Sequence, residues 1–463
     1  LKAARCGKAA IAQDTPYAPP AGQRALPQRP VVIGFGPAGM FAALVLAMAG
    51  ARPIVLERGQ DARTRSEKVR KFWNGGGLDP ECNVQFGEGG AGTFSDGKLN
   101  TGTKNARIGW VLEQFADAGA GADILYDAKP HIGTDVLVEV VQNLRGRIVH
   151  YGGEVRFGAK VTGFLRENGA LAGVVYEQDG QAHTLPCAQA VLAIGHSARD
   201  TFERLLDAGV HLEPKPFSMG VRIEHRQESI NAAQYGASAG RPGLPPADYK
   251  LNVHLPDGRS AYTFCMCPGG QVVAAASEGG GVVTNGMSNA ARDGENANAA
   301  LLVTLCPEDF PGTDALAGMR WQRSLEQTAF RAGGGDYRAP AQLVGDFLAR
   351  RASTQLGAVQ PTYRPGVRLC ELHDVLPARI TDVLERALPE LGKRLQGFDA
   401  PDAVLTAPET RSSSPVRIVR DETRQADLRG LYPCGEGAGY AGGIMSAAVD
   451  GILTAEAILD GSV

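Results

Sequence analysis

The sequence predicts an α/β fold, and three observations lead to this prediction. A short strand, a glycine-rich turn, a helix and a second strand follow one another within residues 30–57. From about residue 213 to 400 the pattern changes to strands followed by helices. After residue 401 glycine-rich loops and a last apolar helix return. We therefore expect a discontinuous α/β domain, 30–212 and 401–463, with an inserted α+β domain at 213–400.

The first α/β unit carries a dinucleotide-binding fingerprint. A strand at 30–34 leads into GFGPAG at 34–39, a helix follows at 40–50, and a strand at 53–56 ends at Glu57. The first glycine permits the tight turn, the second lets backbone approach a pyrophosphate, and the third packs helix on strand. Glu57 stands where a carboxylate accepts the ribose hydroxyls of an adenosine half, although a solvated strand-end glutamate is the alternative. The context predicts a Rossmann-like unit.

The remaining elements follow from periodicity and turn signals. Asn168-Gly169 and Asp179-Gly180 are two-residue hairpin signals, which predict a three-stranded meander. The expected strands are 160–166, 171–177, 182–185, 190–194, 218–224, 262–267 and 271–276, and the expected helices are 106–118, 134–144, 314–331, 340–350, 378–396 and 442–459.

Composition excludes several classes of protein. The chain has 463 residues, with 47 basic and 50 acidic side chains, and a net charge of -3. It therefore lacks the large positive electrostatic field that attracts nucleic-acid phosphates. Its longest apolar stretch, residues 41–49, is far shorter than the roughly 20 residues that span a bilayer. Eight scattered cysteines and no secretory leader fit a reducing cytoplasm. We expect a cytoplasmic protein with no nucleic-acid or membrane partner, and the oligomeric state stays open.

Residues 1–29 have mixed polarity and a proline-rich stretch. We expect a lead-in segment or the remnant of an additional domain.

A second cofactor signal lies near the C-terminus. Gly435 and Glu436 follow a strand-like start, and Gly442 and Gly443 precede the last apolar helix. A carboxylate at this place suits ribityl hydroxyls. The helix N-terminus suits the pyrimidine edge of a flavin, where negative charge develops on reduction.

Three blocks resemble the glutathione-reductase-type FAD-binding superfamily: the fingerprint with Glu57, VLAIG at 191–195, and Gly435-Glu436 before a helix. More narrowly, the chain resembles the bacterial uncharacterised FAD-dependent dehydrogenase family from about residue 30 to the end. The matching stretches are GGAGTFSDGKLN at 89–100, AIGHSARD at 193–200, FCMCPGG at 264–270, TRSSSP at 410–415 and the C-terminal block. Superfamily members more often have Asp at the position of Glu436, and the family often has a further N-terminal domain.

The resemblance implies FAD as the cofactor and an FAD-dependent oxidoreductase. Lys98 is expected along the FAD phosphates or the flavin, with a solvated loop lysine as the alternative. The candidate cofactor-binding residues are Gly34, Gly36, Pro37, Ala38, Gly39, Glu57, Arg58, Gly89, Gly90, Ala91, Gly92, Thr93, Lys98, Val161, Ala193, Gly195, Gly435, Glu436, Gly442, Gly443, Ile444 and Met445.

Two cysteines and one arginine-serine loop are the candidates for catalysis. Cys265 and Cys267 would lie on the same face of a strand. They could be two small buried structural side chains, part of the active-site lining, a redox pair or half of a metal site. We expect the buried structural pair and no metal site. In RSSSPVR at 411–417, the Arg411 guanidinium would bind a substrate carboxylate through two hydrogen bonds, beside Ser413 and Ser414. The equally weighted alternative is a surface loop with ordinary salt bridges. His131 and His196 fit structural roles.

After the strand at 190–194, Gly195-His-Ser-Ala-Arg lacks the glycines of a second fingerprint that would approach a pyrophosphate, and no CxxC pair lies near the first fingerprint. We therefore expect the flavin to exchange a hydride with a small neutral or anionic substrate, and with NAD(P)H or another external donor or acceptor. A flavoprotein acting on RNA or a protein partner, or a non-catalytic redox sensor, are the rival functions.

Overall fold

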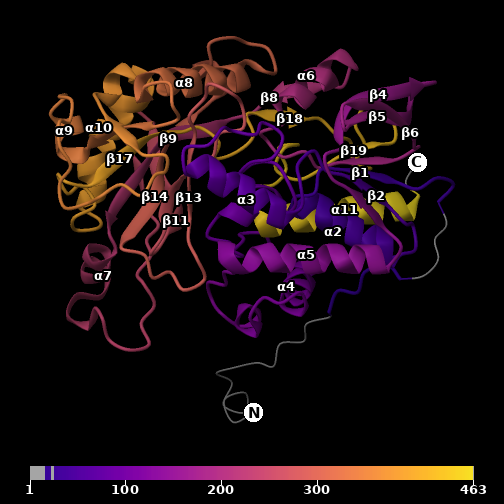
Figure 1. The fold of residues 1–463 in the computed structure, drawn as a ribbon, viewed down its shortest axis with the longest axis horizontal. Coiled ribbons are helices and arrows are strands. Elements are labelled where there is room, and N and C mark those ends of the chain that lie inside the picture. The colour runs from indigo at the N-terminus through magenta and orange to yellow at the C-terminus, as the bar shows by residue number, and fades with distance from the viewer. Residues whose placement is uncertain (1–15, 22–25, 462–463) are drawn as a thin grey trace.

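The computed structural model describes residues 16–21 and 26–461, and it contains two large sheets side by side (Figure 1). The first sheet is parallel and five-stranded, in the order β19-β7-β1-β2-β3. Its strands are β1 (Val31–Ile33), β2 (Ile54–Leu56), β3 (Glu154–Arg156), β7 (Ala190–Leu192) and β19 (Leu431–Pro433). The predicted α/β class is confirmed.

Alternating side chains bury both faces of this sheet. Val32, Val55 and Val191 pack against the helices α2 (Pro37–Met48), α4 (Arg107–Asp117), α5 (Thr134–His150) and α11 (Ile444–Asp460). Their neighbours Val31, Ile33 and Ala190 pack on the opposite side, against the three-stranded sheet β4 (Lys160–Glu167), β5 (Ala170–Gln178), β6 (Gln181–Pro186) and helix α6 (Arg199–Asp207).

The predicted meander is present. β4, β5 and β6 are antiparallel neighbours, and the turns between them have positive φ at Asn168, Gly169, Asp179 and Gly180. Positive φ at both central residues is the geometry of the type I′ hairpin turn that the two Asn/Asp-Gly pairs predicted.

The second sheet has seven strands in the order β10-β11-β14-β9-β17-β15-β16. All neighbours are antiparallel except β15 and β16. The strands are β9 (Phe217–Arg226), β10 (Asn252–His254), β11 (Ser260–Cys267), β14 (Asn296–Leu305), β15 (Ala339–Leu343), β16 (Val367–Leu369) and β17 (Val404–Glu409); they pack against α7 (Gln227–Tyr235), α8 (Ala317–Gly333) and α10 (Ala378–Gly392).

Two short pairs and two further helices complete the fold. The hairpin β12 (Gln271–Ala274) and β13 (Thr284–Met287) lies beside the second sheet, and β8 (Leu212–Pro214) pairs with β18 (Val416–Ile418). The remaining α-helices of the described residues are α3 (Ala62–Trp73) and α9 (Val344–Leu348).

The structure corrects two predictions about the second sheet. The expected helix at 340–350 is instead strand β15 followed by the five-residue helix α9. The expected domain boundary at 400 is also wrong, because β17 pairs with β9 and β15. The chain therefore leaves the second sheet after residue 409.

Part of the lead-in segment packs on the first unit. The Tyr17 hydroxyl donates a hydrogen bond to Glu456 of α11 at 2.6 Å. Residues 1–15 and 22–25 of the expected segment lie outside the described residues. Across 16–21 and 26–461, none of the helices combines the length and the apolar character needed to cross a bilayer.

A buried ion cluster joins the two units. Glu326 of α8 accepts two hydrogen bonds at 2.8 Å from Arg199 of α6, and two from Arg411 at 2.9 and 3.1 Å. All three side chains are almost fully buried. Burial alone would raise the pKa of Glu326, but the two guanidiniums hold it well below its usual range. Separating Glu326 from either arginine would leave an uncompensated buried charge, which is energetically costly. The ion pairs therefore hold the two units together.

Candidate functional site

A pocket lies where the parallel strands end and the two units meet. Its volume is about 340 Å³, within the roughly 300–1,000 Å³ typical of small-molecule sites. The segments that follow β1, β2, β7 and β19 all line it, at 34–38, 57–58, 193–198 and 434–436. The carboxyl ends of parallel strands are the usual place for a ligand in an open α/β sheet.

Glu57 organises the loops on one side of the pocket. Its Oε2 accepts from the backbone N–H of Phe35 at 2.8 Å, and its Oε1 accepts from Gly59 and Gly87 at 2.9 Å. The carboxylate is 4% exposed and lines the pocket. Each carboxylate oxygen has further lone pairs, so Glu57 keeps capacity for a ligand hydroxyl.

Arg65 of α3 donates hydrogen bonds to backbone carbonyl groups of the loops, as Glu57 accepts them from backbone N–H groups. Its buried guanidinium donates to Asn83 and Val84 at 2.8 Å, to Glu88 at 2.7 Å and to Gly90 at 2.9 Å. These carbonyls belong to the irregular loop that forms one wall of the pocket. Burial lowers the pKa of Arg65 to about 10, so it stays charged at neutral pH. The sequence analysis did not identify this residue.

The three fingerprint glycines have different structural roles. At Gly34 a Cβ would lie 2.4 Å from the Ala193 carbonyl oxygen, and at Gly39 it would lie 2.0 Å from that of Gly34. At Gly36, which lines the pocket, a Cβ would meet only the Gly90 Cα, at an ordinary 3.6 Å. Gly34 and Gly39 are therefore needed for packing, whereas Gly36 keeps the pocket clear.

Two helix N-termini face the pocket. Gly36 precedes α2 and Gly443 precedes α11; neither helix has a side-chain cap, and both glycines line the pocket. Uncapped first-turn N–H groups and the helix dipole suit phosphate or another electron-rich group. Asp450 of α11 fixes the nearby turn by accepting from the Gly435 N–H at 2.8 Å.

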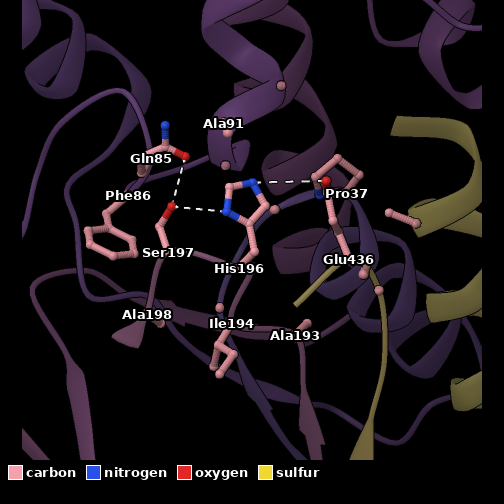
Figure 2. A pocket seen from close by; sticks show the side chains of 18 of the residues that line it. Pro37, Gln85, Phe86, Ala91, Ala193, Ile194, His196, Ser197, Ala198 and Glu436 are labelled. Atoms are coloured by element: carbon pink, nitrogen blue, oxygen red, sulfur yellow. Dashed lines mark hydrogen bonds and ion pairs between the residues drawn. The ribbon is translucent and has the colours of Figure 1, made fainter. Parts of the chain in front are cut away.

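A hydrogen-bonded chain crosses the pocket at the end of β7 (Figure 2). Ser197 donates to Gln85 Oε1 at 3.1 Å, and its oxygen lies 3.2 Å from His196 Nδ1. With Nδ1 protonated toward Ser197, Nε2 is bare and faces Glu436 Oε1 at 3.9 Å. Burial and the charges of Arg411 and Arg199 lower the pKa of His196 to about 3, so the ring is neutral.

Glu436 is the carboxyl group at the end of this chain. Burial raises its pKa to about 7, against the charge of Lys215. The side chain is still 28% exposed, so water in the open pocket offsets part of that burial. Glu436 can therefore hold or release a proton near neutral pH, next to a neutral imidazole acceptor. The structural role predicted for His196 misses this place in the pocket, although its position directly after Gly195, where the strand ends, was a usable signal.

The second unit supplies the remaining wall of the pocket. Phe264, Cys265, Asn285, Glu409, Arg411 and Ser412 line it, together with Lys98 from the glycine-rich loop. Glu409 is paired with Arg222 at 2.7 Å, so its charge is balanced. Asn285 and Glu409 come from β13 and β17, which the sequence analysis did not predict as strands.

The structure corrects the proposed anion anchor. Arg411 lines the pocket, but Glu326 and Ser277 already occupy its guanidinium, so no free fork faces a substrate. Ser414 donates to the carbonyls of Val416 and Gly437 at 2.7 and 3.1 Å, which holds its own loop. Ser413 is not among the lining residues, whereas Ser412 is.

The expectation of two buried cysteines on one regular strand face is also wrong. Cys265 has φ +42° at a register break in β11, and its side chain is partly exposed to the pocket. Cys267 is buried.

Most of the candidate cofactor-binding residues come together in this pocket. The lining includes Gly34, Gly36, Pro37, Ala38, Glu57, Arg58, Gly90, Ala91, Gly92, Lys98, Val161, Ala193, Gly195, Gly435, Glu436, Gly442, Gly443 and Ile444. It does not include Gly39, Gly89, Thr93 or Met445, which shape the surrounding backbone and core.

Known families match both units. A family model described as "FAD binding domain" matches residues 29–198, and one described as "FAD-dependent protein, C-terminal domain-like" matches residues 216–412. The second match ends just after β17, in agreement with the boundary seen in the sheet. A protein of Clostridium beijerinckii, described as uncharacterized, is 51% identical over 441 residues, which cover 95% of this chain and 82% of the relative.

Two solved structures are similar at a greater distance. The flavin-dependent brominase Bmp2 gives a TM-score of 0.42 at 14% identity, over 94% of this chain and 79% of that one. A geranylgeranyl bacteriochlorophyll reductase-like protein of Thermoplasma acidophilum gives 0.41 at 13% identity, over 93% and 79%.

The two matches make the protein an FAD-dependent enzyme with FAD as its cofactor. The pocket fits this group: Gly36 leaves space beside the α2 N-terminus, and Glu57 is a buried acceptor close by.

We expect Gly36→Val to abolish FAD binding while the protein stays folded, because the side chain fills pocket space without meeting protein backbone closely. Gly39→Ala is the matched control, since its Cβ clashes with a carbonyl and lowers the melting temperature first. Flavin absorbance and thermal unfolding separate the two effects. A folded Gly36→Val protein with full FAD content would contradict the assignment.

Glu436 predicts a pH dependence of stability in the FAD-free protein. Its carboxyl keeps a proton in the folded state up to about pH 7 but loses it near pH 4.3 when unfolded. Stability should therefore fall as the pH rises from about 4.3 to about 7, because the unfolded state releases the proton more readily. Glu436→Gln should remove this decline in urea unfolding, and the exposed Glu113→Gln should keep it. Equal pH profiles for wild type and Glu436→Gln would refute the shift.

Proposed function

Because the chain belongs to the same protein family as the Clostridium beijerinckii relative and carries an FAD-binding domain, we propose that it is a dehydrogenase or reductase exchanging a hydride between FAD and a small substrate. The main support for this proposal is that one continuous pocket joins the nucleotide-binding fingerprint to the wall formed by the second sheet. It runs from the fingerprint and Glu57, where an adenosine half fits, to Glu436 and the wall formed by the second sheet. We also propose membership of the glutathione-reductase-type superfamily, which the three matching sequence blocks support.

The side chains divide into those that bind and those that handle protons. The α2 N-terminus would hold the pyrophosphate and Glu57 the ribose hydroxyls. FAD, when bound, supplies the two-electron chemistry that these side chains lack. Glu436 would hold or release a proton beside neutral His196, at the far end of the pocket.

Lys98 replaces Arg411 as the cation available to a substrate. Its side chain is 32% exposed and lines the pocket, and it carries a third N–H beyond its contacts with Asp96 and Met266. An anionic substrate group would meet this ammonium. We propose NAD(P)H or another external molecule as the second redox partner, a cytoplasmic location, and no nucleic-acid or membrane partner.

Anaerobic reduction of the bound flavin tests the proposal. NADH, NADPH, small carboxylic acids and alkenes would each be mixed with the oxidised and with the photoreduced holoprotein. We expect at least one compound to bleach the flavin, or to reoxidise it, at a rate that saturates with concentration. Lys98→Met should raise the half-saturation value for an anionic compound and leave FAD content unchanged.

The contrary result is a yellow protein whose flavin reacts with none of these compounds. That outcome would favour RNA or a protein as the substrate. A reduced flavin that yields a hydroxylated product with oxygen would instead make the enzyme a monooxygenase.

A further inference from the structure

Cys265 and Cys267 lie together at the pocket wall formed by the second sheet. Cys265 lines the pocket, and the Cys267 thiol donates a hydrogen bond to the Cys265 backbone carbonyl at 3.2 Å. The register of β11 against β14 breaks between Phe264 and Cys267, and Cys265 has φ +42°. A cysteine in this left-handed region costs energy, so the surrounding structure must hold it there.

Two cations hold this turn in place. Arg222 donates to the Cys265 carbonyl at 3.0 Å, and Lys98 donates to the Met266 carbonyl. Arg222 is itself fixed by Glu409, which accepts at 2.7 and 3.0 Å. The conformation of this turn is therefore supported from both units: Lys98 comes from the glycine-rich loop and Arg222 from β9.

The spacing of the pair suits a disulfide. Residues i and i+2 of a regular strand have Cα atoms about 6.6 Å apart, at the upper end of the roughly 4.4–6.8 Å seen in disulfides. The bulge and the positive φ shorten the extended path between Cys265 and Cys267.

We propose that Cys265 and Cys267 form a reversible dithiol–disulfide couple that exchanges two electrons with the bound flavin. This inference rests on the proposed function. Starting from the Cys265 thiolate and the Cys267 thiol, forming the S–S bond breaks one S–H bond and releases two electrons and one proton. The oxidised flavin takes both electrons and this proton. The reverse reaction returns the electrons to the disulfide.

The charges around the pair assign a role to each sulfur. The neighbouring Cys267 thiol, together with the Lys98 and Arg222 cations, lowers the pKa of Cys265. The neighbouring Cys265 and burial raise the pKa of Cys267. Cys265 is thus the thiolate that reacts toward the pocket, and Cys267 is the protonated partner behind it.

Anaerobic dithionite titration of the holoprotein tests the electron count. The wild type should take up four electrons per FAD, two for the flavin and two for the disulfide. Cys265→Ser and Cys267→Ser should each take up two. Cys370→Ser, which changes a cysteine outside the pocket lining, should still take up four.

A covalent readout tests the same couple without any activity. Air-oxidised protein would be denatured in N-ethylmaleimide, with and without prior reduction by a phosphine, and digested with trypsin. Residues 260–292 form one tryptic peptide that contains Cys265 and Cys267 and no other cysteine. We expect this peptide to gain two maleimide groups only after reduction.

The outcomes separate the two proposals. A yellow wild-type protein that takes up two electrons, with Cys265 and Cys267 fully alkylated after oxidation, overturns the couple and leaves the proposed function intact. A protein that binds no FAD overturns both. If a serine variant does not fold, the alkylation of the wild type still decides.

Discussion

The walls of the pocket are irregular backbone, and the rest of the site depends on satisfying its polar groups without a helix or a sheet. Buried N–H and C=O groups that lack partners are costly. Here two buried side chains of opposite charge supply them. Glu57 accepts from three backbone N–H groups, and Arg65 donates to the carbonyls of the glycine-rich loop. The loops can therefore stay open around a ligand while the backbone remains fixed.

The same principle extends to the junction of the two units. Glu326 receives both Arg199 and Arg411, which come from different units, and it thereby holds the end of β17 against the pocket. Arg411 is thus a positioning residue for the wall of the second sheet. This arrangement lets one pocket combine a nucleotide-binding end with a chemically distinct end that contains Lys98, Cys265 and Glu436.

Local sequence signals predicted the parts of the fold that local physics determines. The fingerprint and the two Asn/Asp-Gly turns need particular backbone angles, so their residues could be recognised directly. Strand β14 was missed because it is buried on both sides, alanine-rich and without alternation. β15 was mistaken for a helix for a similar reason: its apolar residues contain no turn that would separate it from α9.

Site residues that depend on distant partners could not be read from the sequence. Arg411 looked free because Glu326 lies 85 residues away, and only the fold brings the two together. The position of Cys265 follows from a bulge supported by Arg222 and Lys98, and no pattern within FCMC shows it. The lining residues next to the fingerprint were predictable because the carboxyl ends of neighbouring parallel strands must converge.

The central claim is that this pocket holds FAD, and the cofactor released on denaturation tests it most directly. The purified protein, reconstituted with a mixture of FAD and FMN and then desalted, would be denatured and its supernatant analysed by mass spectrometry. The structure predicts one FAD per chain and no FMN, because Glu57 and the α2 N-terminus are built for an adenosine half that FMN lacks. Release of FMN, or of no flavin at all, would contradict the account.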